Sequence, residues 1–112
     1  MHNYKELKVW LKARELVKFI YKLTTKFPKE EVYGLTSQMR KAVISISSNI
    51  AEGSGHSSNK EFNHFLEISY SSASELETQL ILSFDLEELN EGNDRINEVQ
   101  KMLKGLMNSL RN

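Results

Sequence analysis

The chain has 112 residues, the length of one domain, and its 15 Lys and Arg balance its 15 Asp and Glu. It has no cysteine, which excludes disulfides and thiolate metal sites, and no run of 18 apolar residues, which excludes a membrane-spanning helix. We therefore expect a single domain over residues 1–112, with the cytoplasm as its default compartment.

Charge is distributed unevenly along this neutral chain. Residues 1–30 contain eight Lys or Arg and three Glu, whereas residues 61–90 contain seven Asp or Glu and no Lys or Arg. Two interpretations remain open. Either the basic and acidic segments lie beside each other, within one subunit or across an interface, or the basic segment forms a surface that binds phosphates.

The first helix is expected over residues 5–27. Trp10, Val17 and Ile20 recur at three- and seven-residue steps and mark its buried side. The opposite side is basic and supplies most of the candidate nucleic-acid contacts. These candidates are Lys5, Lys8, Lys12, Lys18, Lys22 and Lys26, joined by Arg40 and Lys41 from the next helix. Pro28 ends the first helix, because the residue before a proline is disfavoured in helical geometry.

The second helix, expected over residues 36–53, has two faces that are unsuited to solvent. Ile46 and Ile50 mark one face as core, and Asn49 falls on that side, where we expect it to bond buried backbone. The other face carries Ile44 and small residues in place of Lys and Glu, so it favours close contact with another subunit. Together with flanking positions of the third helix it forms the predicted oligomer interface: Ile44, Ser47, Ser48, Ala51, Ile68, Tyr70 and Ile81.

The third helix is expected over residues 59–88 and the fourth over residues 94–110, with a turn at residues 90–93 between them. Ser58 and Glu61 have the spacing of a capping box that opens the third helix. No stretch alternates with the period of a strand. Four helices joined by short connections predict an all-α protein that folds as an up-down-up-down antiparallel four-helix bundle.

No catalytic, cofactor-binding or metal-binding residues are predicted. Glu61-x-x-His64 has the spacing of a di-iron bundle motif, but the second pair that such sites need is missing. The stretch Gly53-Ser54-Gly55 follows a helix rather than a strand, so we interpret it as a helix stop and not as a phosphate loop. No serine has a histidine at the spacing of a known nucleophile motif. We therefore expect a protein that is not an enzyme.

Two stretches closely resemble one known family. They read YGLTSQMRKA over residues 33–42 and SISSNIAEG over residues 45–53. The resemblance continues through Glu61-Phe62, Phe65-Leu66 and residues 75–80, and it includes Trp10 and Phe27-Pro28, so it covers nearly the whole chain. The family is that of the small four-helix-bundle proteins named for intervening sequences in 23S ribosomal RNA genes.

The resemblance implies a bundle that assembles as a homopentamer, a ring-like homo-oligomer. The family is also similar to the accessory protein of diversity-generating retroelements, a basic pentamer that binds nucleic acid and a reverse transcriptase. Family members commonly carry arginine where this chain has His56 and in the region of Ser69–Ser72. The basic character that the family implies is therefore weaker in this chain.

The leading hypothesis is a non-catalytic homo-oligomeric interaction module that binds RNA, or an acidic partner protein, through the basic face of its first helix. The alternative is a protein–protein scaffold with no nucleic-acid binding, whose lysines serve solubility and pairing between subunits. An enzyme would instead require a polar pocket lined by Asn49, Glu52 or His64. Neither a cofactor nor a membrane is expected as a partner.

Overall fold

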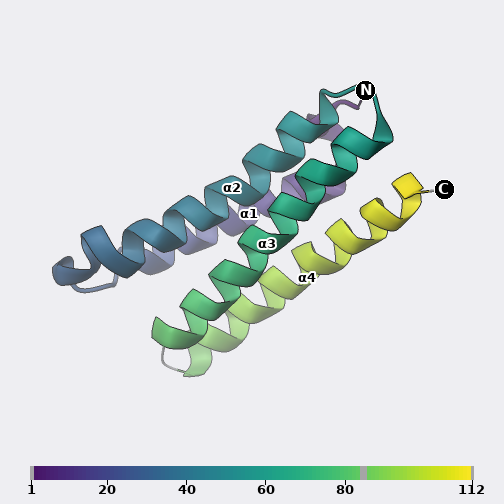
Figure 1. The fold of residues 1–112 in the computed structure, drawn as a ribbon. Coiled ribbons are helices and arrows are strands. Elements are labelled where there is room, and N and C mark those ends of the chain that lie inside the picture. The colour runs from purple at the N-terminus through teal and green to yellow at the C-terminus, as the bar shows by residue number, and fades with distance from the viewer. Residues whose placement is uncertain (1, 84–85, 112) are drawn as a thin grey trace.

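The computed structural model describes the backbone of residues 2–83 and 86–111, and the side chains of all of these except 32, 33 and 86–91. This described chain is helical and contains no strand, which confirms the all-α expectation. Its four long helices are α1 (Lys8–Thr24), α2 (Ser37–Ser54), α3 (Asn59–Ser83) and α4 (Leu86–Arg111) (Figure 1). Short helical turns at Tyr4–Glu6, Lys29–Glu31 and Val32–Thr36 precede α1 and α2.

The four helices pack lengthwise into a body of 44 × 23 × 20 Å. α2 packs against both α1 and α3, and α4 packs against both α3 and α1 (Figure 1). Of these four contacts, the one between α2 and α3 is the most extensive and the one between α1 and α4 the least. The backbone N–H of His2 donates to Ser54 O at 2.9 Å, so the start of the chain lies beside the end of α2.

The core is built from one apolar stripe of each helix. Its largest fully buried side chains are Leu16, Ile20, Met39, Val43, Ile46, Ile50, Phe62, Leu66, Leu76, Leu80, Ile96 and Leu103. Burying a side chain of this size contributes about 1.5–3 kcal/mol, so the stripe decides which way each helix faces. On α1 the stripe runs through Val9, Leu16 and Leu23. The expected inward residues Trp10 and Val17 are therefore only partly buried.

The ends of α1 lie inside the predicted range 5–27. Leu7 has an extended backbone (φ −74°, ψ 125°), which separates the turn at residues 4–6 from the helix. At the other end, the Thr25 hydroxyl donates to Lys22 O at 2.6 Å and satisfies one of the carbonyls that a helix end leaves unpaired. The predicted cap of α3 is confirmed, because Ser58 Oγ accepts the Glu61 N–H at 3.1 Å. None of the described helices combines the length and the apolarity that a bilayer crossing requires.

The connection between α3 and α4 lies earlier in the chain than the predicted turn at residues 90–93. α3 ends at Ser83 and α4 begins at Leu86, so Gly92 lies inside α4. A Cβ atom at Gly92 would overlap Leu80 Cδ2, and Phe19 Cε2 lies 3.4 Å from the same point. Glycine at this position therefore allows α4 to approach its neighbours, and it does not end a helix.

Gly53 has the same role between α2 and α3. The stretch Gly53-Ser54-Gly55 does end the helix as predicted, because α2 ends at Ser54 and Gly55 is its C-cap, but Gly53 itself is buried in the last turn. A Cβ atom at Gly53 would lie 2.7 Å from Phe65 Cβ. Asn49 is a further correction. It is half-buried rather than buried, and its Nδ2 donates to Ser45 O of the same helix at 2.9 Å.

Candidate polyanion-binding groove

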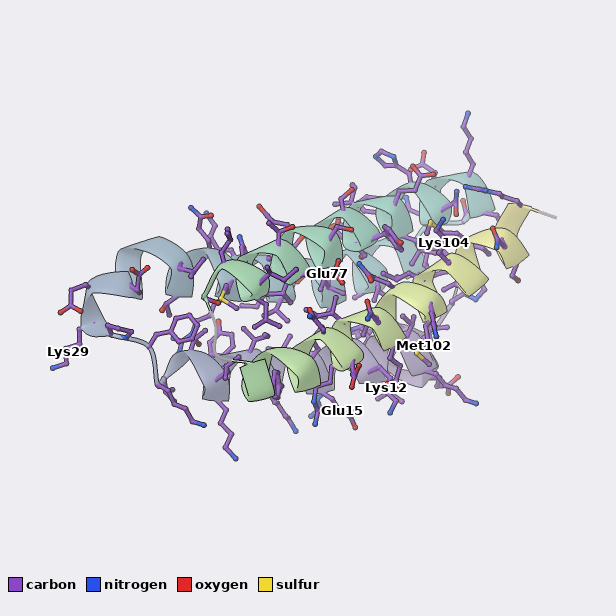
Figure 2. The ribbon with its side chains drawn as sticks, turned by 90° about the horizontal axis from the view of Figure 1, so that it is seen from below. Lys12, Glu15, Lys29, Glu77, Met102 and Lys104 are labelled. Atoms are coloured by element: carbon purple, nitrogen blue, oxygen red, sulfur yellow. The ribbon has the colours of Figure 1, made fainter. Side chains whose placement is uncertain are left out.

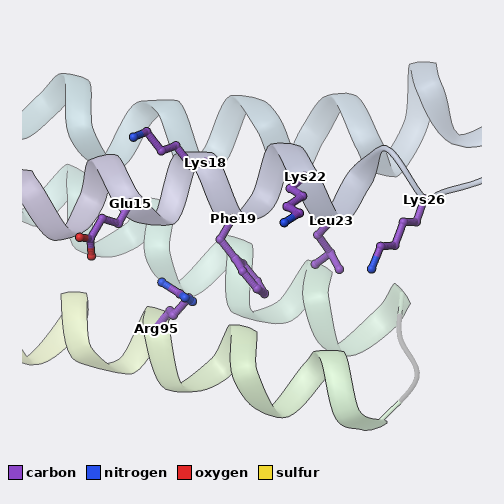
Figure 3. Close-up of a pocket in the computed structure, with 7 residues that line it drawn as sticks. All are labelled: Glu15, Lys18, Phe19, Lys22, Leu23, Lys26 and Arg95. Atoms are coloured by element: carbon purple, nitrogen blue, oxygen red, sulfur yellow. The ribbon is translucent and has the colours of Figure 1, made fainter.

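A groove of about 570 Å³ lies between α1 and α4 (Figure 3). Lys18 and Lys22 line it from one face of α1, and Lys26 lines it from the turn that follows this helix. Arg95 lines it from α4. The remaining lining residues are Glu15, Phe19 and Leu23. Three of the predicted lysines thus share one open hollow with a fourth cation.

Arg95 was not among the predicted cations. Its guanidinium carbon lies 5.0 Å from the centroid of the Phe19 ring, within the range of a cation–π contact. Phe19 is half-buried and packs against the core, so its ring holds the exposed Arg95 beside the groove. Residues 19 and 95 meet only because α4 packs on α1, and no motif in the sequence links them. The one available signal was a phenylalanine placed among the lysines.

Lys12 lies outside this groove. Its Nζ is 3.8 Å from Glu15 Oε2 and 3.4 Å from Glu98 Oε1 of α4, and Figure 2 shows Lys12 and Glu15 beside that helix. The lysine therefore pairs with α4 rather than with the acidic third helix. Both carboxylates are more than half exposed, so each pair contributes at most about 1 kcal/mol.

Arg40 serves the packing of the bundle. Its Nε donates to Thr24 Oγ1 at 2.9 Å and its Nη2 donates to Tyr21 O at 3.3 Å. The guanidinium carbon also lies 4.5 Å from the centroid of the Tyr21 ring. These contacts tie the start of α2 to the end of α1 and make Arg40 a weak candidate for a phosphate contact. The other predicted cations outside the groove, Lys5, Lys8 and Lys41, are exposed.

The predicted oligomer interface lies partly on the outer face of α2 and α3. Ile44 and Ile68 are 41% and 37% exposed, which leaves two large apolar side chains in contact with water. Ser48 is exposed, and the neighbouring Ser47 and Ala51 are half-buried. None of these residues lines the α1–α4 groove.

Serine hydroxyls bond α2 to α3 beneath this face. The buried Ser69 Oγ donates to Ile46 O at 2.9 Å, and Ser72 Oγ donates to Ser45 Oγ at 2.9 Å. Small side chains at these positions allow the two helices to approach closely, as Gly53 does at the end of α2. The small residues that the sequence displays here therefore serve contact within the subunit as well as any contact outside it.

A family model described as 23S rRNA-intervening sequence protein matches residues 5–108. The chain belongs to this family. The match to the 23S rRNA-intervening sequence family extends from the turn before α1 to the last turns of α4, so it covers the groove and the α2–α3 face alike. No curated protein matches the chain significantly.

In this 23S rRNA-intervening sequence protein, two of the predicted interface residues lie away from Ile44. Tyr70 lines a hollow between α3 and α4, where Lys104 Nζ lies 5.6 Å from the centroid of its ring. Ile81 is 57% exposed near the end of α3, beside Leu82 at 76%. The predicted interface is thus divided over two parts of the surface.

The residues considered for metal binding or catalysis do not converge. Glu61 Oε2 lies 3.4 Å from His56 Nδ1, whereas the His64 ring packs edge-on against Phe65 with centroids 5.8 Å apart. Asn49 bonds within α2. Among the side chains that the structure describes, no group of three His, Asp or Glu is placed to hold a metal ion.

Proposed function

We propose that this protein is a non-catalytic, homo-oligomeric four-helix bundle that binds RNA through the basic side of α1. In this proposal the helices run alternately up and down, and copies assemble into a ring of five. The observation that carries the proposal is the α1–α4 groove, where four cations line one open hollow. The resemblance to the accessory protein of diversity-generating retroelements supports the same function.

The charge of the groove suits a polyanionic ligand. Its described lining contains Lys18, Lys22, Lys26 and Arg95 against the carboxylate of Glu15. One copy offers few phosphate contacts and therefore weak binding. A ring would hold identical grooves in one geometry, so that a long RNA engages several of them and gains affinity from their high effective concentration.

The exposed apolar face of α2 and α3 supports the self-association part of the proposal. Ile44 and Ile68 lose contact with water when a second copy covers them, and removal of apolar surface from water favours association. Neither residue lines the groove. Assembly through them would leave the residues that line the groove available to RNA.

RNA binding is tested by the fluorescence anisotropy of a labelled RNA over a series of salt concentrations. We expect binding that weakens steeply with salt, because phosphate contacts release counterions. The triple substitution Lys18→Glu, Lys22→Glu and Lys26→Glu should abolish it. The matched control reverses three exposed lysines elsewhere, with the same change in net charge: Lys29, Lys60 and Lys101, each to Glu.

The two triple variants distinguish RNA binding in the groove from general electrostatic attraction to a basic protein. Retained binding in the control together with loss in the groove variant supports the proposal. Equal loss in both variants would show that net charge alone attracts RNA and that the groove has no special role. Absence of binding by the unmodified protein even at low salt would refute RNA binding.

Self-association is tested by measuring the mass of the particle in solution. Ile44→Glu should lower that mass to one subunit while preserving most of the helical circular dichroism, because the side chain lies outside the core. Ser109→Glu introduces the same charge at an exposed position of α4 and should leave the mass unchanged. A monomeric mass of 13.0 kDa for the unmodified protein would refute the assembly.

A protein–protein scaffold is the second candidate function. Ile81 and Leu82 favour it, because these adjacent residues are 57% and 76% exposed and lie at the far end of α3 from its Ser58 cap. In that case a partner protein would cover the end of α3, and the lysines would serve solubility. Failure to bind RNA, together with an intact oligomer, would leave this function in place of the first.

A further inference from the structure

We propose that the α1–α4 groove takes a single strand of nucleic acid rather than a duplex, with one base stacked on the guanidinium of Arg95. This inference rests on the proposed function and specifies its ligand. Three features of the groove support it: the line of its lysines, a described α4 lining that supplies one cation rather than a second row, and the arginine–phenylalanine contact.

The three lysines of the groove form a single row. Lys18 and Lys22 are four residues apart on α1, over which a helix rises about 6 Å, and Lys26 continues the row from the turn after the helix. This spacing is similar to the step between neighbouring phosphates along one strand. The row therefore suits consecutive phosphates of a strand that runs parallel to α1.

The α4 side of the groove does not supply a matching second row. Arg95 is the one residue of α4 in the described lining of the groove. A duplex brings two phosphate backbones to the protein, and the second one would meet no row of cations in the described lining from α4. A row of lysines on the α1 side and a single described cation on the α4 side therefore favour one backbone over two.

The α4 side of the groove offers a flat group to a base. The Arg95 guanidinium lies 5.0 Å from the centroid of the Phe19 ring, and both residues line the hollow between the helices (Figure 3). Guanidinium planes and aromatic rings are the groups on which unpaired bases stack in proteins that bind single strands. A duplex keeps its bases stacked on one another and cannot offer one to Arg95.

The test compares a labelled 12-nucleotide oligouridine, a duplex RNA of the same length and uridine monophosphate as a competitor. We expect the oligouridine to bind more tightly than the duplex and the mononucleotide to compete poorly. Arg95→Lys keeps the charge and removes the flat group, so the affinity for oligouridine should fall at least about fivefold, the lower end of what one stacked base contributes. The dependence of that affinity on salt should stay unchanged, because no charge is lost.

A second substitution distinguishes the loss of a stacked base from a change in the fold. Phe19→Leu retains an apolar side chain under Arg95 and should cause a similar loss of affinity for oligouridine, with unchanged circular dichroism and unchanged particle mass.

Equal or tighter binding of the duplex would overturn the single-strand inference while leaving RNA binding intact. Unaltered oligouridine affinity in Arg95→Lys would refute the stacked base, and effective competition by the mononucleotide would make the groove a nucleotide pocket. If none of the three probes binds, the proposed function itself is refuted.

Discussion

Replacing Gly53 with alanine measures how closely α2 approaches α3. The added Cβ would lie 2.7 Å from Phe65 Cβ and 3.3 Å from Phe62 O. A Cβ and a carbonyl oxygen move only with the backbone, so the helices must separate to admit the methyl group. Overpacking of this kind costs about 1–3 kcal/mol, and the helix preference of alanine over glycine offsets at most about 1 kcal/mol. We expect Gly53→Ala to lower the free energy of unfolding by up to about 2 kcal/mol, the overpacking cost less the gain in helix preference.

Gly105→Ala is the matched control, because a Cβ atom at this position of α4 would meet no heavy atom within 4 Å. It gains the helix preference of alanine without the clash and should raise the free energy of unfolding by about 0.5–1 kcal/mol. Both variants are measured by urea unfolding, followed by circular dichroism at one protein concentration. Equal stabilisation of the two would refute the close approach of α2 and α3 at Gly53.

Two further substitutions test single contacts by the same measurement. Arg40→Lys keeps the charge but should lower the free energy of unfolding by about 1–2 kcal/mol, because lysine cannot reproduce the pair of hydrogen bonds to Thr24 and Tyr21. Unchanged stability would mean that these hydrogen bonds do not hold α2 to α1. Ser58→Ala removes the cap of α3 and should cost about 1 kcal/mol, whereas the same change at the neighbouring exposed Ser57 should cost little.

The sequence predicted which residues form the core more reliably than where the helices end. Ile46, Ile50 and Phe62 recur at helical spacing and are all buried, because the burial of such side chains dominates the orientation of a helix. The stop at residues 53–55 was predicted to within one residue, whereas Gly92 was placed in a turn and lies inside α4. A glycine that ends a helix and one that admits a neighbouring helix both lack a side chain, and the sequence alone does not distinguish them.

The candidate groove was predicted only in part for a similar reason. Lys18 and Lys22 lie one turn apart on α1 and Lys26 follows in the turn after it, so their common side follows from local spacing. Arg95 joins them through the packing of α4 on α1, which lies far away in the chain. Arg40 was grouped with the lysines by its charge, but its contacts with Thr24 and Tyr21 depend on how α2 lies against α1.

The hydrogen bonds of serine hydroxyls between α2 and α3 make local opening easier elsewhere in the bundle than between these two helices. Sliding α3 by one residue would leave the buried Ser69 hydroxyl without Ile46 O, so this pair of helices has one favourable register. α1 packs least extensively on α4, and the exposed Lys12–Glu98 pair adds little there. Backbone amides facing that seam should exchange with deuterium before those between α2 and α3. The region that fluctuates most readily is then the one that carries the row of lysines.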